Sequence, residues 1–335
     1  MSQVGLPNDP NGGLAMSLAN AAYATDISAC LSSHVPGWTV AWKADQSING
    51  NLAYIGHDGH SQYVVAIRGS EFDISYDTFD DWFEQDLDIL EQVPWVYPSL
   101  PTKPVISGGA VKGLNNLIQL KQTSGGTSTT MLEFLMANAV PTGKAIVVVG
   151  HSLGGNLATV YAPWLRYQIA KAGVPLLPPF SVLTFAAPTA GNPAFAHFFD
   201  STFPNSWRYY NTIDIIPMAS DNIVGMGNLY KKPGPQASDI TQSFWIPILN
   251  CQVTVSLQEV FVLVAFGLAL AVSLGQLQPY AQTNQTHGSV ALNIGGTLCA
   301  PEGTDPLIQW FEQAKCQHGV ETYLTNLGVT PFICP

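Results

Sequence analysis

Charged side chains are scarce in this sequence. Asp, Glu, Lys and Arg make up 10% of its 335 residues, against about 25% in a typical soluble domain. The 12 Lys and Arg are outnumbered by 23 Asp and Glu, which gives a formal net charge of −11 and leaves too few cations for a nucleic-acid surface. The surface must therefore consist mainly of uncharged polar residues, which favours an extracellular or lipid-facing protein.

Cysteine is also sparse, and basic residues are missing from the N-terminus. The cysteines are too widely spaced for a zinc site, and their odd number leaves at least one thiol unpaired; they are Cys30, Cys251, Cys299, Cys316 and Cys334. Four of them follow residue 250, so one or two disulfides in the C-terminal part are compatible with the sequence. Without a basic start, residues 14–24 are better interpreted as a first amphipathic helix than as a cleavable signal peptide. Low charge favours secretion, and a cytoplasmic location stays open.

A long run of apolar residues, Val260–Leu274, lies within a charge-poor insert at 240–277. Its 15 residues would rise about 22 Å as a helix, which is shorter than the roughly 30 Å hydrocarbon core of a bilayer. Glu259 is the only charged residue between Ile240 and Pro301. Three interpretations stay open: a buried or capping helix, a segment that enters a lipid surface, or a span that needs help from its flanking residues.

Apolar residues make up 47% of the chain, so it can bury a sizeable core, and its length suits a single α/β domain spanning residues 1–335. Helical spacing predicts a helix at 109–120, and the Ser, Thr and Gly residues of 123–130 predict a flexible loop. Apolar segments bounded by Gly, Asn and Asp predict strands within 38–45, 51–59, 62–70, 145–149, 180–188 and 206–217. This alternation predicts a mostly parallel sheet with helices on both faces.

The segment "VVVGHSLGGNLA", residues 147–158, places Ser152 between a buried strand and a helix. Gly150 and Gly154 supply positions without a Cβ on either side of the serine, which a sharp turn needs. This G-x-S-x-G pattern is typical of the nucleophile elbow, which lifts a serine hydroxyl above the carboxyl end of a parallel sheet. Ser152 is therefore the candidate nucleophile, with an ordinary tight turn as the alternative.

A serine nucleophile needs a histidine that accepts its proton and a carboxylate that orients the histidine. After such an elbow the acid comes next in the chain and the histidine last. Asp214, at the end of an apolar strand, is the candidate acid, and only His287 and His318 follow it. Context alone leaves these two open, because His287 precedes an alternating segment and His318 stands at a helix-like start.

Two N–H groups must also bind the negative charge that develops on a substrate carbonyl oxygen. Leu153 directly follows the serine and Ser70 ends an earlier strand, so their backbone N–H groups form the candidate oxyanion hole. A plain turn is the alternative at Ser70. Downstream, residues 71–91 predict an amphipathic lid, or otherwise an acidic surface helix, because acids alternate with Phe72, Tyr76, Phe79, Trp82 and Phe83.

In combination, these segments resemble the class 3, or fungal-type, triacylglycerol lipase family. The resemblance runs from about Leu14 to Leu324, most of the chain, and it rests on several motifs in a fixed order. They are "VVAIRGS" before the candidate lid, "VVVGHSLGGNLA", "TFAAPTAGNPAFA", "RYYNTIDIIP" and "QHGVETYL".

The resemblance implies an α/β-hydrolase fold with a lid, and a triad of Ser152, Asp214 and a late histidine. The apolar cap insert and the long candidate lid are departures from the smaller fungal members of the family. The resemblance favours His318 over His287, because Tyr323 and Leu324 follow His318 at the family's spacing. The implied activity is hydrolysis of triacylglycerols at a lipid–water interface, with no metal or organic cofactor and no obligate protein partner. A phospholipase A1, a feruloyl-type esterase and a non-catalytic lipid-docking module stay open as alternatives.

Overall fold

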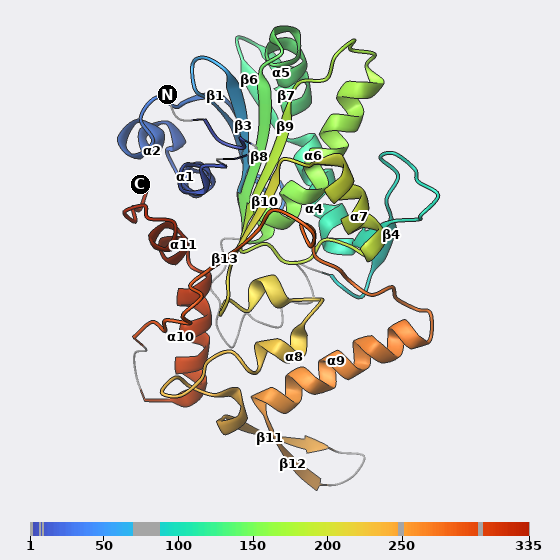
Figure 1. The fold of residues 1–335 in the computed structure, drawn as a ribbon, viewed down its shortest axis with the longest axis vertical. Helices are drawn as coiled ribbons and strands as arrows, with labels where there is room; N and C mark the ends of the chain where they lie inside the picture. Colours follow the sequence, from blue (N-terminus) through green and yellow to red (C-terminus); the bar gives the residue numbers. More distant parts are fainter. Residues whose placement is uncertain are drawn as a thin grey trace.

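The computed structural model describes residues 3–6, 8, 10–69, 88–246, 251–300 and 304–334. Figure 1 shows a central sheet with helices on both faces and a second lobe beyond one end of the sheet. The seven strands of the sheet are, in spatial order, β1 (Thr39–Lys43), β2 (Ala53–His57), β3 (Gln62–Ile67), β8 (Ala145–His151), β9 (Phe180–Phe185), β10 (Ser206–Asn211) and β13 (Ser289–Leu292).

The strands from β3 to β13 run parallel, and β1 and β2 form an antiparallel edge. The side chains of β3 and β9 are buried along their whole length, as expected where helices cover both faces of a parallel sheet. The predicted strands and the mostly parallel sheet are therefore confirmed. Because parallel strands end at the same edge, the residues that follow β3, β8 and β10 come together there.

The helices fall into two layers. One face of the sheet carries α1 (Gly12–Ala21), α2 (Ile27–His34) and α11 (Val320–Asn326), and the other carries α4 (Gly108–Gln119), α5 (Met131–Asn138), α6 (Leu153–Lys171) and α7 (Pro193–Thr202). Successive residues of β8 point to opposite faces, so Val148 joins the core under α6 and Val149 joins the core under α1. Burial of both sets of side chains fixes the position of β8 between the layers.

Two short hairpins complete the upper part of the molecule. They pair β4 (Gln92–Pro94) with β5 (Val105–Ser107), and β6 (Lys121–Ser124) with β7 (Thr127–Thr130). The second hairpin corrects the expectation of a flexible loop at 123–130. Gly125 and Gly126 both have positive φ, at 57° and 81°, which allows the tight two-residue turn that this pairing requires.

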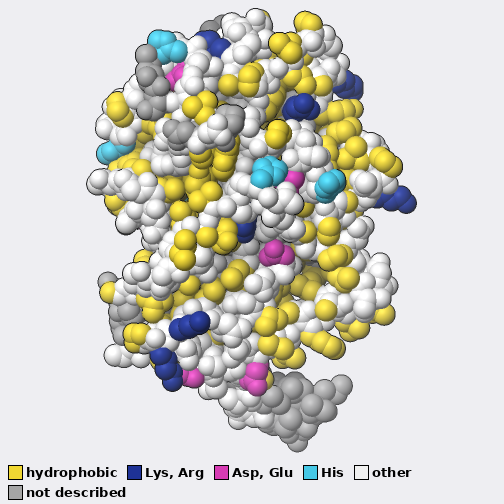
Figure 2. All heavy atoms as spheres, viewed as in Figure 1, with side chains coloured by type: hydrophobic (Ala, Val, Ile, Leu, Met, Phe, Trp, Pro, Cys, Tyr) yellow, Lys and Arg dark blue, Asp and Glu magenta, His cyan; other side chains and the backbone are white. Residues whose placement is uncertain are grey.

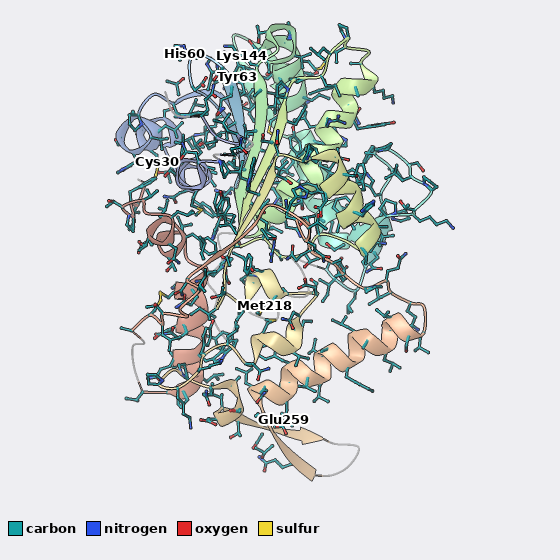
Figure 3. The ribbon with its side chains drawn as sticks, viewed as in Figure 1. Cys30, His60, Tyr63, Lys144, Met218 and Glu259 are labelled. Carbon is teal, nitrogen blue, oxygen red and sulfur yellow. A yellow bond between two sulfur atoms is a disulfide. The ribbon has the colours of Figure 1, made fainter. Side chains whose placement is uncertain are left out.

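The second lobe follows β10 and lies beyond the carboxyl ends of the strands (Figure 1). Its chain passes through α8 (Ile223–Met226), the β11–β12 hairpin (Thr241–Ile246 and Cys251–Ser256), α9 (Leu257–Ser273) and α10 (Pro306–His318), with 3₁₀ turns at Ile216–Met218 and Ala237–Asp239. Another 3₁₀ turn, Val140–Thr142, precedes β8. Figure 3 shows Met218 inside this lobe and Glu259 in the first turn of α9.

The apolar run at 260–274 is a helix, but it is not buried as a whole. Phe261 is only 4% exposed, whereas Leu263, Phe266 and Leu274 are 60%, 67% and 63% exposed. The interpretation as a buried helix is therefore wrong for the outer face of α9. Within the described part of the chain, no helix is both long enough and apolar enough to cross a bilayer.

Two disulfides connect distant parts of the chain. Cys30 of α2, labelled in Figure 3, pairs with Cys334 near the C-terminus, and Cys299 pairs with Cys316 of α10. The first closes a separation of 304 residues and the second a separation of 17. Both involve the C-terminal part, in agreement with the expectation from the cysteine positions.

The turn between β8 and α6 is formed by the single residue Ser152, whose φ is 60° and ψ is −132°. Its backbone N–H donates to the Phe185 carbonyl at 2.9 Å. A Cβ on Gly150 would collide with the carbonyl of Gly154, and a Cβ on Gly154 would collide with the carbonyl of Ile67. The two glycines of the elbow are thus required by close backbone contacts.

We expect Gly154→Ala to lower the free energy of unfolding by about 1–3 kcal/mol, because its methyl group meets backbone rather than a movable side chain. Gly267→Ala in α9 is the matched control, since its methyl group would meet no described atom within 4 Å. That substitution should stabilise the helix by about 0.5–1 kcal/mol. Urea denaturation followed by circular dichroism measures both, and equal stability of the two variants would contradict the packing argument.

Candidate active site

Ser152, His318 and Asp214 form a continuous chain of hydrogen bonds at the carboxyl edge of the sheet. The His318 Nε2 atom lies 2.8 Å from the Ser152 Oγ atom, and the His318 Nδ1 atom lies 2.9 Å from Asp214 Oδ2. With Nδ1 protonated toward the carboxylate, Nε2 is free to accept the serine proton. All three residues are buried, although their positions in the sequence are up to 166 residues apart.

The carboxylate of Asp214 is held on both of its oxygens. The Tyr323 hydroxyl donates to Oδ2 at 2.9 Å, and the backbone N–H of Ile216 donates to Oδ1 at 2.9 Å. Burial, followed by the charge of Asp214, raises the pKa of Tyr323 well above its usual value, so its hydroxyl stays protonated as a donor. The backbone N–H of Asn211 in turn donates to the Tyr323 oxygen at 2.9 Å. These contacts fix the carboxylate that faces His318.

His151, the residue before the serine, contacts His318 from the other side. Its Nε2 atom lies 2.9 Å from the His318 backbone carbonyl oxygen, which can only accept, so Nε2 carries the proton. Its Nδ1 atom lies 3.3 Å from the hydroxyl of Tyr23. Burial, and secondarily the nearby His318, lower the pKa of His151 well below the usual 6.5. His151 therefore stays neutral and holds the backbone of the histidine that faces Ser152.

His318 is the last residue of α10, which corrects the expectation that it begins a helix; α11 starts two residues later. The preceding residue, Gln317, is buried and forms hydrogen bonds through both its backbone carbonyl and its side-chain amide. Its carbonyl oxygen and its Oε1 accept from Asn211 Nδ2 at 2.9 and 2.7 Å, and its Nε2 donates to the Thr297 carbonyl at 3.1 Å. The Cys299–Cys316 disulfide links the same end of α10 to the chain that follows β13. The end of α10 is thus fixed against the strand end that leads to Asp214.

The two candidate oxyanion donors have different outcomes. Leu153 is the first residue of α6, where a backbone N–H has no acceptor within the helix, and the helix dipole adds positive potential there. Ser70 lies outside the described residues. Its neighbour Gly69 is described, and a Cβ built on Gly69 would lie 3.2 Å from the Ser152 Cβ. The end of β3 therefore reaches the serine, and the Gly69 N–H donates to the Tyr23 hydroxyl at 3.2 Å.

Most of the predicted lid at 71–91 also lies outside the described residues, including all five of its aromatic residues. Of the part that is described, Ile89 is buried and Leu90 is 68% exposed. The carbonyl of Ile89 accepts from the Tyr280 hydroxyl at 2.9 Å. The end of this segment is thus attached to the chain that follows α9.

His287, the alternative base, is not brought to the serine. It is exposed before β13, and its Nδ1 atom lies 3.2 Å from the neighbouring Thr286 hydroxyl. Because the residues before β13 lie at the amino edge of a parallel sheet, this side chain is at the opposite end from Ser152. The structure therefore pairs Ser152 with His318.

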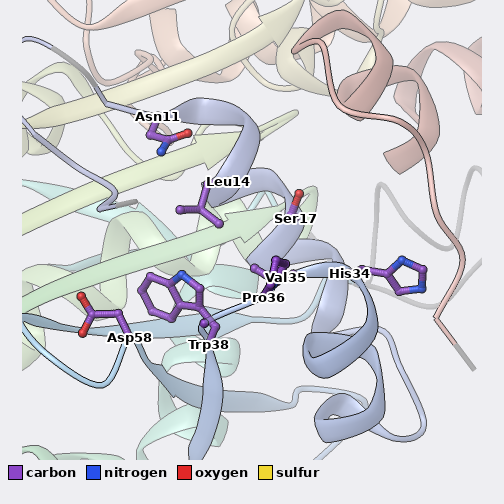
Figure 4. A pocket seen from close by; sticks show the side chains of 9 residues that line it. Asn11, Leu14, Ser17, His34, Val35, Pro36, Trp38 and Asp58 are labelled. Carbon is purple, nitrogen blue, oxygen red and sulfur yellow. The ribbon is translucent and has the colours of Figure 1, made fainter. Parts of the chain in front are cut away.

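A pocket of about 360 Å³ lies elsewhere, between α1, the loop after α2 and the end of β2 (Figure 4). Trp38, His34 and Asp58 contribute to its lining, and none of the three residues of the hydrogen-bonded chain does. The Asp58 carboxylate already accepts from the backbone N–H groups of residues 60, 61 and 62. This pocket is thus separate from the candidate active site.

The overall structure is similar to the solved structure titled "Crystal structure of M37 lipase". The TM-score is 0.68 at 23% sequence identity, and the similarity covers 96% of this chain and 92% of that one. The shared architecture is the α/β-hydrolase fold, a mostly parallel sheet with helices on both faces. The expected fold class is therefore confirmed.

Sequence comparison gives a more specific result. The family described as Lipase (class 3) matches residues 64–223, a range that contains the elbow serine and Asp214. The chain resembles the class 3 lipase family over this range, which is just under half of its length. Its resemblance to this family, first suggested by the order of its motifs, is confirmed. The family match ends before His318, so the histidine rests on the geometry described above.

The chain is also similar to curated proteins over shorter stretches. It is 36% identical over 98 residues to the secreted mono- and diacylglycerol lipase 1 of Fusarium solani, and 33% identical over 90 residues to the phospholipase A1-II 5 of Oryza sativa subsp. indica. The stretches cover 29% and 26% of this chain and 26% and 19% of the relatives. The chain thus spans about a quarter or less of the length of the curated relatives it matches.

Several residues around the triad were not singled out from the sequence. They are Tyr23, Gln317 and His151, which contacts the His318 carbonyl. His151 occupies a variable position of the G-x-S-x-G pattern, and Tyr23 precedes it by 128 residues, so no local spacing connects them. Only Tyr323 had a signal, its place after His318 at the family's spacing, and this spacing did not indicate a hydrogen bond to Asp214.

We expect the stability of this protein to fall as the pH falls below about 6.5, because His151 protonates more readily in the unfolded chain than in the folded protein. His151→Gln keeps an amide donor but does not titrate. Its free energy of unfolding should therefore change less between pH 6.5 and pH 5, by up to about 1.4 kcal/mol per pH unit. Urea denaturation at several pH values measures this. A comparison of the two proteins at about pH 8, where His151 is neutral in both states, isolates the effect of the substitution on packing. If the free energy of unfolding depended on pH equally in wild type and His151→Gln, the assignment of this pH dependence to His151 would be contradicted.

We expect the Cys30–Cys334 disulfide to contribute more to stability, and the Cys299–Cys316 disulfide to contribute more to the geometry of the active site. In the chain-entropy model, loss of Cys30–Cys334 costs about 6 kcal/mol and loss of Cys299–Cys316 about 3 kcal/mol. The second pair lies beside His318, so Cys299→Ser/Cys316→Ser should slow phosphonate labelling of Ser152 by about 10- to 100-fold. Cys30→Ser/Cys334→Ser is the matched control, and equal loss of labelling in both double variants, below their melting temperatures, would argue against a local role.

Proposed function

We propose that this protein is a serine carboxylic-ester hydrolase that cleaves triacylglycerols at a lipid–water interface. The observation that carries the proposal is the continuous hydrogen-bonded chain from Ser152 through His318 to Asp214, with distances of 2.8 and 2.9 Å. Its order matches the arrangement in which histidine takes the proton of a serine nucleophile while a buried carboxylate stabilises the imidazolium.

In the proposed reaction, Ser152 Oγ attacks the acyl carbonyl carbon and its proton passes to His318 Nε2. Asp214 stabilises the resulting imidazolium, and the hydrogen bonds from Tyr323 and Ile216 keep its carboxylate in place. The imidazolium then protonates the leaving alcohol, which leaves an acyl group on the serine. Water, deprotonated by His318, releases the acid. No metal or organic cofactor is needed for any of these steps.

The negative charge of the tetrahedral states would lie near the start of α6. We assign its stabilisation to the Leu153 N–H, with the Ser70 N–H as second donor. The position of Gly69 against the Ser152 Cβ supports the second assignment, because it brings the end of β3 beside the serine. Loss of one such donor typically costs about 10²- to 10³-fold in rate.

The acylglycerol substrate is supported by the family and by the name of the Fusarium solani relative, a mono- and diacylglycerol lipase. A phospholipase A1 is the second candidate, since the rice relative carries that name. The same relay would also serve a feruloyl-type esterase. The triad does not choose between these substrates, because the acyl chain and the alcohol are selected by surrounding surfaces. A lipid-docking module without catalysis is less well supported, since it would not need the relay.

We further propose that the chain acts as a single α/β-hydrolase domain with a lid at 71–91 and an apolar insert at 240–277. An extracellular site of action is supported by two disulfides, by the low content of charged residues and by the name of the secreted fungal relative. Disulfides persist in oxidising compartments, which is the physical basis of this proposal.

The catalytic assignment is tested by hydrolysis of p-nitrophenyl butyrate. Ser152→Ala, His318→Ala and Asp214→Asn should each lower kcat by about 10⁴-fold or more, because each interrupts the same proton transfer. His287→Ala is the matched control and should retain wild-type activity, since this histidine is exposed at the opposite end of the sheet. Loss of activity in His287→Ala, or retention in His318→Ala, would overturn the assignment.

The substrate proposal needs a separate assay with emulsified trioleoylglycerol, dioleoylglycerol and phosphatidylcholine. Faster release of fatty acid from the glycerides than from phosphatidylcholine is the expected result. A preference for phosphatidylcholine would favour the phospholipase A1 alternative. A wild-type protein that is inactive on every ester would support the non-catalytic docking module instead.

A further inference from the structure

Helix α9 is fastened to the molecule along one side. Phe261 is 4% exposed and packs against Trp310 of α10, with 5.7 Å between the ring centroids. Leu257, Ala265 and Leu268 are partly buried against the same core. The first turn is closed by a capping box between Ser256 and Glu259, so the helix has a defined start. The contacts hold α9 in a fixed orientation on the second lobe.

The opposite side of α9 is apolar and exposed. We call it the α9 stripe and define it as Val262, Leu263, Phe266, Leu270 and Leu274, the last of which directly follows the helix. These side chains are 45%, 60%, 67%, 47% and 63% exposed. Four of these residues are spaced by four positions, so they form one row along the helix. A helix that is apolar on all sides is normally covered, and a contiguous exposed apolar patch marks an interaction surface.

The surroundings of the stripe carry almost no charge. The sequence contains no Lys or Arg between Pro233 and Ala314, and the carboxylate of Glu259 is engaged by the N–H and hydroxyl of Ser256. Figure 2 shows hydrophobic side chains and no Lys or Arg over the lower right of this face, where α9 lies in Figure 1. With a net charge of −11 on the whole chain, this surface matches an uncharged partner and opposes an anionic one.

A second copy of the chain fits the stripe less well than a lipid surface does. Five large side chains on one helix are far fewer than the roughly 20–30 residues per partner of a standard protein interface. They resemble the exposed side of a helix that lies flat in the lipid interface, with apolar side chains entering the acyl region. At 17 residues, α9 would extend about 25 Å along such a surface.

The stripe also lies at the end of the molecule that carries Ser152. The second lobe lies beyond the carboxyl ends of the strands, where the elbow is located (Figure 1). After α9, Gln278 exchanges two hydrogen bonds of 2.8 Å with Gln92, and Tyr280 donates to Ile89. Ile89 lies near the end of the candidate lid at 71–91, and Gln92 directly follows it. A lipid surface on the stripe would therefore be close to the segment through which substrate is proposed to enter.

We propose that the α9 stripe is a docking surface for uncharged lipid, separate from the candidate lid. This inference rests on the proposed function, since it names the surface on which that function would operate. Docking is driven by burial of apolar side chains and involves no cationic contact, so it should be insensitive to salt and should not need anionic headgroups. Electrostatic attraction, which many peripheral proteins use, plays no part in it.

The test is co-sedimentation with vesicles of pure phosphatidylcholine. Phe266→Gln/Leu270→Gln should lower the partition coefficient at least tenfold relative to wild type. The matched control, Leu176→Gln/Ile333→Gln, changes residues that are 83% and 80% exposed outside α9, and it should bind like wild type. Wild-type binding should be unchanged between 50 and 500 mM NaCl and should weaken when phosphatidylglycerol is added at low salt.

Two further measurements separate this inference from the proposed function. The Phe266→Gln/Leu270→Gln variant should hydrolyse soluble p-nitrophenyl butyrate at the wild-type rate but act at least tenfold more slowly on emulsified trioleoylglycerol. Ser152→Ala should bind vesicles like wild type although it is inactive. Vesicle binding can therefore be measured even if the proposed catalytic activity is wrong. Equal binding by the stripe variant and wild type, or no vesicle binding by wild type, overturns the proposal. If wild type formed a dimer and the Phe266→Gln/Leu270→Gln variant were monomeric, the proposal would be overturned, and a second copy of the chain would be the partner of the stripe.

Discussion

The turn at Ser152 is the constraint on which the rest of the site depends. One residue with a φ of 60° carries the chain from the central strand β8 directly into α6. This conformation costs energy for a residue other than glycine, and it persists only where the surrounding structure holds it. Here the Phe185 carbonyl anchors the serine N–H, and Gly150 and Gly154 allow backbone contacts that a methyl group would prevent. The strained turn is thus held by the packing of three neighbouring strands against one helix.

Around this fixed serine, the other groups of the site are positioned mainly through their backbones. His318 stands at the end of α10, where His151 binds its carbonyl and Gln317 joins the preceding residue to Asn211. Asp214 lies just after β10 and is held by a buried tyrosine. Each hydrogen bond contributes only about 1 kcal/mol to stability, but removal of one partner would leave a buried polar group without a hydrogen bond. The geometry of the relay is therefore a property of the whole buried network.

The two lobes of the molecule have different surfaces. The sheet and its helices bury their apolar residues in two continuous cores, whereas α9 buries one side and exposes the other. Hydrophobic burial within the fold accounts for the first arrangement and gives no reason for the second. The exposed side has a stability cost unless it contacts something apolar, which the proposed lipid substrate would supply. In the proposed function, the rigid relay performs the chemistry and the exposed helix brings it to the lipid.

Local signals in the sequence were sufficient for several parts of this protein. The apolar runs predicted the strands, the glycines around Ser152 predicted the elbow, and the order of the motifs predicted the class 3 lipase family and its fold. These signals depend on neighbours in the chain, where side-chain periodicity and backbone sterics decide the conformation. The same signals predicted Asp214 as the candidate acid, because it follows an apolar strand and a parallel sheet brings its strand ends to one edge.

Only the tertiary structure decided the features that connect distant residues. It brought His318 rather than His287 to the serine, because His287 precedes β13 at the amino edge of the sheet while α10 ends at the carboxyl edge. It also turned the glycine-rich segment 123–130 into a hairpin and left the outer side of α9 uncovered. Whether an apolar side chain is buried depends on which element lies opposite it in space. Hydropathy along the chain cannot specify that partner, since burial is a property of the assembled fold.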